Sequence, residues 1–321
     1  MFKYTRIVTE GLMVRIFAPS TSFYLGRIYT MKKVLTFIQA FLPFIVILAL
    51  QMILIFVLSI IAGTQLISEQ PDLASNQTLY KELISARASQ MLPNAVMILH
   101  ILNVIIMLFW FTRINKKDNT PGTSFKRSVT IKNIVMVTLI AIGIQCVITS
   151  GLNLINYMKP ELLANYKALL DKAGITSSSV PGLIAATFLA PIGEELAFRG
   201  VTMRYLKKAG AGFWVVTILP AILFGVQHLN IVQGIYAAII GFVLGYIMYK
   251  YDSIYLTILL HMIINTTSCI TDLELLDTDN LTHILIMCLV GVIFSAAARY
   301  ATITNPAVVP VETTSDTTQC A

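Results

Sequence analysis

The stretch that decides the fold of this chain is Pro191-Ile192-Gly193-Glu194-Glu195-Leu196-Ala197-Phe198-Arg199-Gly200, which follows an apolar run over residues 180–190. It places two carboxylates and a guanidinium within six residues of one another in an otherwise apolar segment. A charged side chain at the centre of a bilayer costs about 2.5 to 3.5 kcal/mol on insertion scales, so charges inside a membrane mark functional sites by default. The stretch therefore predicts a membrane-spanning helix that carries a functional site.

The spacing of the three charges gives them different roles. Glu195 and Arg199 are four residues apart, so on a helix they can form an ion pair that offsets part of the cost of burial. Glu194 is rotated by about 100° from Glu195 around the same helix and has no such neighbour. We predict that Glu194 is the chemically active carboxylate and that the Glu195/Arg199 pair supports it. The alternative is that all three lie at the cytoplasmic interface and extend toward water.

The composition of the whole chain agrees with a membrane location. Of its 321 residues, 56% are hydrophobic and 12% are charged, whereas soluble domains carry about 25% charged residues. The net charge of +7 could indicate nucleic acid, but Lys and Arg cluster at the ends of apolar runs, where they orient helices in a bilayer. The cysteines show no disulfide or zinc-binding spacing. The composition predicts an all-α, polytopic integral membrane protein whose partner is the lipid bilayer and not nucleic acid.

Eight apolar segments are long enough to cross a membrane, which takes about 20 helical residues. They predict a bundle of about eight transmembrane helices at residues 34–62, 91–111, 134–157, 181–204, 213–229, 232–249, 254–269 and 281–298. Residues 1–33 form a basic N-terminal arm or result from a mis-assigned start, because Met31-Lys32-Lys33 reads like a natural start. The remaining divisions are N-terminal transmembrane helices (34–179), a transmembrane core that holds the charged stretch (180–300) and a polar, disordered tail (301–321).

The connections between the segments predict the orientation. The loop over residues 113–132 is rich in Lys and Arg, and the loop over residues 271–280 has four acidic residues and no base. Since basic loops face the cytoplasm, both termini are expected to be cytoplasmic and the acidic loop external. Residues 161–172, also external, have an interfacial amphipathic pattern. In the sixth segment, Gly241 and Gly245 predict a face for close helix packing.

Two further polar pairs lie in apolar segments. Phe224 and His228 close the fifth segment, and His261 and Asn265 lie in the seventh. At a rise of about 1.5 Å per residue, the helices can bring both pairs to the layer of the charged stretch. A lone histidine inside a membrane is more often a hydrogen-bonded packing residue. Two histidines near segment ends are interpreted in that way: His100 and His283.

These residue types support two chemistries. A carboxylate and an imidazole can share and deprotonate a water for attack on a carbonyl, while a second imidazole and an amide donate hydrogen bonds to the oxyanion. Equally, Glu194, His228 and His261 form a His₂Glu set, the ligand type of hydrolytic zinc sites. Both routes lead to amide hydrolysis. The chain has no His-Glu-x-x-His motif, no Gly-x-Ser nucleophile elbow and no paired aspartates on facing segments.

Glu194-Glu195-x-x-x-Arg199, Phe224-x-x-x-His228 and His261-x-x-x-Asn265 together resemble the three motifs of the CAAX protease and bacteriocin-processing (CPBP, formerly Abi) intramembrane proteases. The resemblance covers about residues 181–269. It implies an eight-helix bundle in which Glu194 and His228 activate water and His261 and Asn265 stabilise the oxyanion. It also implies a membrane-associated peptide or protein as substrate, and we expect a bacterial plasma membrane as the location.

Two other function classes stay open. The first is a non-catalytic membrane protein that acts in bacteriocin immunity or regulates a membrane partner by binding it in the same cavity. The second is a proton- or cation-coupled transporter, for which intramembrane carboxylates and histidines are also typical. Transporters often show inverted repeats, and no repeat is visible in this sequence. A complete set of acid, base and oxyanion donors favours the endopeptidase.

A zinc cofactor is the open point of the chemistry. Zinc-binding histidines need an acceptor behind each ring, and the nearest one that the sequence offers is Asn265, one helical turn beyond His261. No further carboxylate is evident that could polarise His228. Because this ligand set has no evident supporting shell, the sequence favours metal-independent hydrolysis, with zinc at Glu194, His228 and His261 as the alternative.

Overall fold

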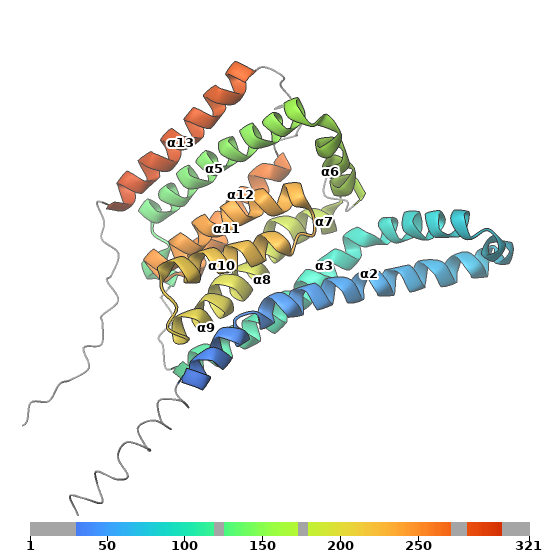
Figure 1. Cartoon of the computed structure of the whole chain (residues 1–321), viewed down its shortest axis with the longest axis horizontal. Coiled ribbons are helices and arrows are strands. Elements are labelled where there is room, and N and C mark those ends of the chain that lie inside the picture. Colours follow the sequence, from blue (N-terminus) through green and yellow to red (C-terminus); the bar gives the residue numbers. More distant parts are fainter. Residues whose placement is uncertain (1–29, 119–124, 173–178, 271–280, 304–321) are drawn as a thin grey trace, which may run out of the picture.

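The structure is a computed structural model that describes residues 30–118, 125–172, 179–270 and 281–303. Within these ranges every regular element is a helix and none is a strand, which confirms the all-α prediction (Figure 1). The acidic loop at 271–280 and nearly all of the predicted N-terminal arm and polar tail lie outside the described residues.

Among the described residues, five helical segments are long and apolar enough to cross a membrane: Thr30–Glu69, Gln77–Lys116, Ile131–Met158, Val180–Lys208 and Ile231–Tyr251. Each coincides with one predicted span. The other three predicted spans fall on shorter apolar helices, at Phe213–Val226, Ile254–Cys269 and Ile284–Phe294. The chain is therefore an integral membrane protein, and the count of about eight crossing helices stays a prediction.

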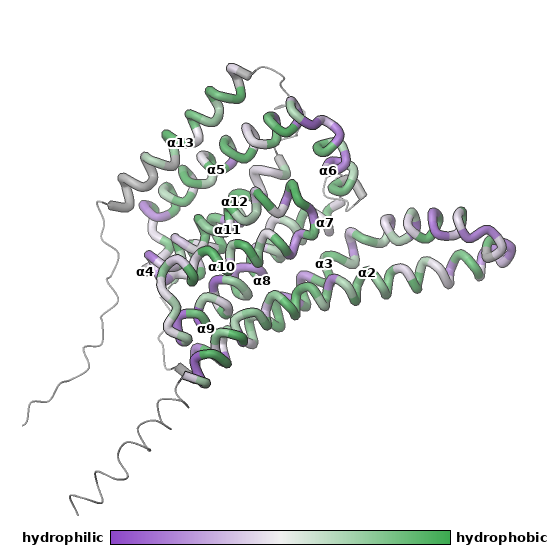
Figure 2. Tube along the Cα trace, in the orientation of Figure 1, coloured by the Kyte–Doolittle hydropathy of each residue, from purple (hydrophilic) through white to green (hydrophobic). Residues whose placement is uncertain are grey.

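The described helices form two parts. α2 (Leu42–Glu69) and α3 (Gln77–Asp118) run side by side as a long pair whose far end, around η1 (Pro71–Ser75), reaches past the other helices (Figure 1). Figure 2 shows apolar residues along much of this pair and hydrophilic ones near the turn that joins it. The other part contains α4 (Phe125–Ser128), α5 (Ile131–Met158), α6 (Pro160–Lys172), α7 (Val180–Ile184), α8 (Ala190–Glu195), α9 (Met203–Lys208), α10 (Phe213–Val226), α11 (Ile231–Tyr251), α12 (Ile254–Ile270) and α13 (Leu281–Ile303).

The helical segment that carries the charged stretch contains two π-helical stretches among its α-helical ones. Two π-helical segments, η2 (Ala185–Leu189) and η3 (Leu196–Thr202), lie on either side of α8. Pro191, near the start of α8, has no N–H to donate to the turn before it, so a wider turn at η2 leaves no donor unsatisfied there. π-Helical turns are rare and occur frequently at functional sites. Here they flank the two adjacent carboxylates.

Close packing of α10 against α11 confirms the predicted small-residue face. A Cβ atom at Gly241 would lie 3.0 Å from the Cα atom of Ala221, and one at Gly245 would lie 3.3 Å from the carbonyl oxygen of Thr217. Any larger side chain would push the two helices apart. This contact fixes α11 next to α10, which carries the Phe224 motif.

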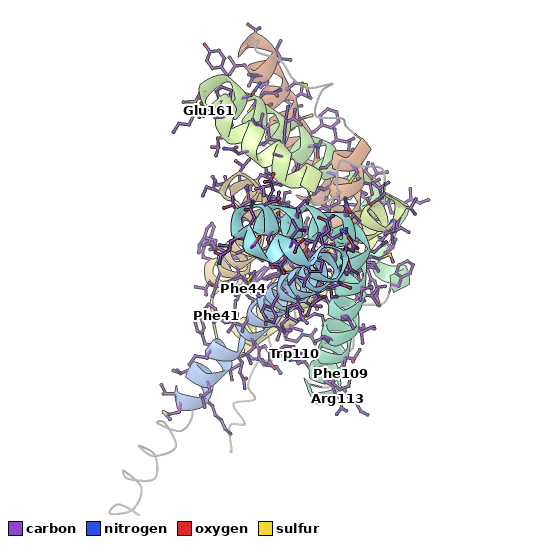
Figure 3. The ribbon with its side chains drawn as sticks, turned by 90° about the vertical axis from the view of Figure 1, so that its right-hand side faces the viewer. Phe41, Phe44, Phe109, Trp110, Arg113 and Glu161 are labelled. Atoms are coloured by element: carbon purple, nitrogen blue, oxygen red, sulfur yellow. The ribbon has the colours of Figure 1, made fainter. Side chains whose placement is uncertain are left out.

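The end of the molecule that is predicted to face the cytoplasm lies far from the end that is predicted to face outside. Figure 3 shows Glu161, at the start of α6, at one end of the bundle, whereas Arg113, near the end of α3, lies at the opposite end. Arg113 has its guanidinium 4.9 Å from the ring centroid of Phe109. The predicted amphipathic segment is helical as α6, but Leu163 and Tyr166 are buried against the bundle. Which end faces the cytoplasm stays a prediction.

Candidate active site

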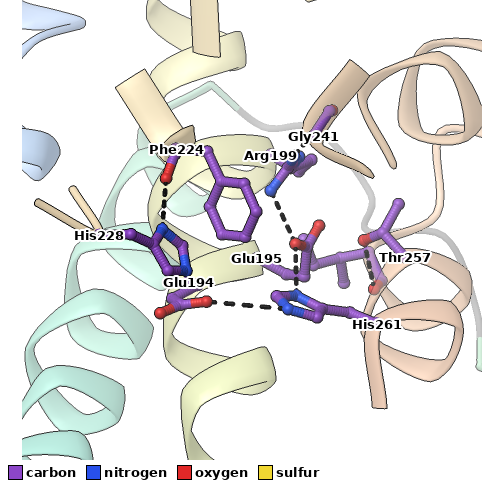
Figure 4. A network of polar contacts seen from close by, with 9 residues as sticks. Glu194, Glu195, Arg199, Phe224, His228, Gly241, Thr257 and His261 are labelled. Atoms are coloured by element: carbon purple, nitrogen blue, oxygen red, sulfur yellow. Dashed lines mark hydrogen bonds and ion pairs between the residues drawn. The ribbon is translucent and has the colours of Figure 1, made fainter. Parts of the chain in front are cut away.

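The structure brings the predicted site residues together from separate elements: Glu194 and Glu195 from α8, Arg199 from η3, His228 from the turn after α10, and His261 and Asn265 from α12. Figure 4 shows the carboxylates, the guanidinium and both imidazoles around the ring of Phe224. The exposed fractions of Glu194, Glu195 and Arg199 are 9%, 0% and 1%. This burial excludes the alternative in which the charges extend into water.

The predicted ion pair is present at the centre of the site. Arg199 donates from Nη1 to Oε1 of Glu195 at 2.7 Å, as their spacing predicted. Its Nη2 donates to the backbone carbonyl of Gly241 at 2.8 Å, and the guanidinium carbon lies 4.9 Å from the centroid of Phe224. Arg199 therefore ties the charged helix to α10 and α11 while it balances one carboxylate.

His261 lies between the two adjacent carboxylates (Figure 4). Its Nδ1 is 3.0 Å from Oε1 of Glu195, and its Nε2 is 3.8 Å from Oε2 of Glu194. An ionised carboxylate accepts hydrogen bonds only, so the proton on a neutral His261 belongs on Nδ1. Glu195 thus has two partners, Arg199 and His261, where the sequence predicted one.

Asn265 bonds to the backbone of the π-helical segment η2, a partner that the sequence did not indicate. Its Nδ2 donates to the backbone carbonyl of Ala186, in η2, at 2.8 Å. Asn265, the nearest acceptor that the sequence offered for a ring N–H of His261, does not have that role, because Glu195 faces Nδ1 of the ring. An amide nitrogen carries two protons, so one N–H of Asn265 remains for another acceptor.

His228 is oriented by the backbone of its own motif. Its Nδ1 is 2.9 Å from the carbonyl oxygen of Phe224, and since a carbonyl only accepts, Nδ1 carries the proton and Nε2 of the neutral ring is a base. The chain turns sharply after this histidine, with Leu229 at a positive φ of 54° and the side chain of Asn230 capping α11. In Figure 4 the free edge of the ring is turned toward Glu194.

Phe224 is the apolar centre of the site, a role that the sequence did not reveal. Its ring makes edge contacts with Phe198, His228 and His261 at centroid distances of 5.6, 5.2 and 5.5 Å. Both imidazoles therefore pack on one ring, which restricts how each can rotate. An aromatic residue one turn before a histidine was the available signal, because residues four apart share a helix face.

The donor set Glu194, His228 and His261 does not fit a metal in this structure. Within the described part of the chain, no three His, Cys, Asp or Glu side chains are arranged to hold one ion. The expectation that no supporting shell exists is nevertheless wrong, because Nδ1 of each histidine has an acceptor behind it, Glu195 or the carbonyl of Phe224. No chemical step below uses a metal.

A small pocket reaches Glu194 from the α2–α3 pair. It is lined by Ile47, Leu50, Gln51, Leu99, His100, Asn103 and Glu194. The sequence did not predict this contribution, since polar residues scattered along apolar helices do not reveal which way they face. His100 was interpreted as a hydrogen-bonded packing residue, but its buried Nδ1 has no hydrogen-bond partner among the described residues. The side chain of His283 is outside the described set.

Comparison with known proteins gives one match. Residues 176–267 fit the model of a family described as type II CAAX prenyl endopeptidase Rce1-like. These residues contain all three motifs, and the match confirms the resemblance predicted from them. No curated protein and no solved structure matches the chain.

Proposed function

We propose that this protein is an intramembrane endopeptidase of the CAAX type, which hydrolyses a peptide bond in a membrane-associated protein or peptide. The family match supports this class of enzyme. The observation that carries the proposal is the position of Glu194, whose carboxylate lies between a pocket and the two histidines that the motifs supply. A carboxylate beside an imidazole is suited to proton transfer during hydrolysis.

In the proposed reaction, Glu194 and Nε2 of His228 hold a water molecule. The water loses a proton to this pair as its oxygen attacks the carbonyl carbon of the substrate, and a tetrahedral intermediate forms. The same pair then delivers the proton to the amide nitrogen, so the C–N bond breaks and a free amine leaves. The carboxylic acid product keeps the oxygen that came from water.

His261 and Asn265 are proposed as donors to the oxyanion of that intermediate. Asn265 has one N–H left after its bond to the carbonyl of Ala186. His261 donates from Nε2 only when both ring nitrogens carry protons, since Nδ1 already faces Glu195. Donors fixed before the reaction are worth several kcal/mol when charge develops on oxygen in a water-excluded site.

The test uses purified protein reconstituted in vesicles. The substrates are a fluorogenic peptide that ends in a farnesylated CaaX sequence and the same peptide without the lipid. Wild type is expected to cleave the lipidated peptide, and Glu194→Gln is expected to lower kcat/KM by about 1,000-fold because the proton acceptor is lost. Glu161→Gln, on α6 at the end of the bundle, is the matched control and should keep wild-type activity.

Equal cleavage by wild type and Glu194→Gln would overturn the assignment of the base. If wild type cleaves neither peptide, membrane fractions from cells that express wild type or Glu194→Gln are compared by proteomics for a peptide that appears only with wild type. The absence of any such peptide would argue for the non-catalytic alternative. The orientation is proposed as predicted, so a single cysteine at Glu161 should react with an impermeant reagent from outside and one at Arg113 should not.

A further inference from the structure

Four polar atoms of the α2–α3 pair are buried without a hydrogen-bond partner among the described residues: Oδ1 of Asn115, and a group of three made up of Oε1 of Gln51, Nδ1 of His100 and Oδ1 of Asn103. All three side chains line the pocket that also contains Glu194. Leaving one such group unpaired costs about 1 to 3 kcal/mol. None of the three belongs to the stretch that matches the family, which begins at residue 176.

The packing between the two parts of the molecule holds Asn103 in this pocket. Asn103 is only 4% exposed. A Cβ atom at Gly193 would lie 2.6 Å from its Nδ2, so the absence of a side chain at Gly193 is what lets α3 approach α8 there. The amide of Asn103 therefore packs beside the residue that precedes Glu194.

The chemistry of these side chains indicates the ligand. The amides of Gln and Asn present one acceptor and two donors each, the same groups as a peptide bond. A peptide must be extended at the bond that is attacked, and its N–H and C=O groups then need partners, because each unsatisfied backbone group inside a bilayer costs several kcal/mol. Proteins often supply these partners from a strand edge. The described residues contain no strand.

We propose that Gln51, His100 and Asn103 form a subsite that binds the backbone of the extended substrate segment next to the bond that Glu194 attacks. Oε1 of Gln51 and Oδ1 of Asn103 accept from peptide N–H groups of the substrate, and His100 pairs with the adjacent peptide unit. The α2–α3 pair thereby holds the substrate while the motif-bearing helices supply the chemistry. This inference rests on the proposed function for the identity of the ligand.

The test removes single donors from the substrate. In the farnesylated CaaX peptide, each backbone N–H near the mapped cleavage site, the scissile amide excepted, is replaced in turn by an ester oxygen. In wild type, one ester position should lower kcat/KM by about tenfold, the size expected for a lost hydrogen bond to a buried group. With Gln51→Leu or Asn103→Leu, kcat/KM for the all-amide peptide should fall by a similar factor, and the same ester should cause less than about a twofold further change.

The comparison of two peptides on one protein separates binding from folding. A variant that is partly misfolded loses activity on both peptides alike, so the ratio between them stays at the wild-type value. Matched controls are Gln65→Leu on α2 and Asn94→Leu on α3, which make the same substitutions at exposed positions of the same helices. Both controls should keep the wild-type ester effect.

The failure of this inference differs from the failure of the proposed function. If wild type cleaves the peptide and every ester acts equally on wild type, Gln51→Leu and Asn103→Leu, the subsite is wrong and the endopeptidase stands. If no peptide is cleaved, binding of the labelled amide and ester peptides to protein in nanodiscs is measured by anisotropy. Ester-sensitive binding that disappears in Asn103→Leu supports the subsite without the enzyme, and ester-insensitive binding overturns it.

Discussion

Two Glu/Arg ion pairs of this molecule have the same chemistry and opposite surroundings. Glu69 and Arg87 join α2 to α3 through hydrogen bonds of 3.0 and 2.8 Å, and both side chains are partly exposed. Glu195 and Arg199 are joined at 2.7 Å with neither side chain exposed. Water can replace either partner of the first pair. Water does not reach the pair of Glu195 and Arg199, so only other protein groups can act as partners for these charges. The pair is therefore part of a network of protein groups.

The same contrast separates the two parts of the molecule. In the most apolar stretch of Thr30–Glu69 and of Gln77–Lys116, 11% of the residues are buried, compared with 56% in Val180–Lys208. The motif-bearing helices thus pack against protein, and the α2–α3 pair mostly faces lipid. Among the described residues, buried polar atoms without a partner occur in both parts, but it is those of Gln51, His100 and Asn103, on α2 and α3, that line the pocket at Glu194. The difference supports the proposal that the motif-bearing helices supply the chemistry and that the α2–α3 pair binds the substrate.

The largest expected effect comes from neutralising the buried pair. Glu195→Gln leaves the guanidinium of Arg199 without a counter-charge and weakens the orientation of His261. Breaking a buried pair costs about 3 to 5 kcal/mol, so we expect low yield of folded protein and an unfolding transition at lower temperature. Circular dichroism in detergent and size-exclusion yield measure both.

The exposed pair is the control for that prediction. Glu69→Gln removes the same charge from the same kind of pair, and exposed pairs contribute little to stability, so yield and unfolding should match wild type. Equal destabilisation by Glu195→Gln and Glu69→Gln would show that burial does not distinguish the two pairs.

The next effect tests the contact between the two parts. Gly193→Ala places a Cβ where Nδ2 of Asn103 lies 2.6 Å away, so either the buried Asn103 side chain must rotate out of its position or α3 must shift from α8. Overpacking of this kind costs about 1 to 3 kcal/mol, and activity should fall with it. Asn103→Ala in the same protein makes room and should restore stability without restoring activity. Gly151→Ala is the control, because a Cβ there meets nothing within 4 Å; stability unchanged by Gly193→Ala would contradict this contact.

The sequence predicted which polar residues of different helices lie in one layer, but not which of them form bonds across the helices. The Glu195/Arg199 pair follows from a spacing of four residues, and the helices follow from apolar length. The bond from His261 to Glu195 joins positions 66 apart, and Asn265 meets Ala186 across 79. Which face each helix turns to its neighbour depends on tertiary packing that spacing does not encode. That is why the bond between Glu195 and His261 and the pocket contribution of α2 and α3 were both missed.

A smaller effect is expected from Phe224→Leu. The variant keeps an apolar side chain but removes the ring on which both His228 and His261 pack. Such ring contacts are worth about 0.5 to 1.5 kcal/mol, so kcat should fall by about threefold to tenfold. KM should be nearly unchanged, since the substrate contacts that we propose lie on α2 and α3. Phe188→Leu, at a side chain that is 52% exposed, is the control. A change in KM alone would contradict a role in orienting the histidines.

The smallest expected effect is that of metal removal. Nδ1 of both histidines faces a hydrogen-bond acceptor, as it does in metal-binding histidines. Dialysis against a strong chelator therefore tests whether the reaction needs a metal ion. Among the residues that the structure describes, however, no three potential ligands come together, and Glu194 with His228 can activate water without an ion. We therefore expect activity of the purified protein to be unchanged, within about twofold, after dialysis against the chelator. Zinc in near one-to-one ratio by elemental analysis, lost together with activity and restored by adding zinc, would assign Glu194, His228 and His261 as ligands instead.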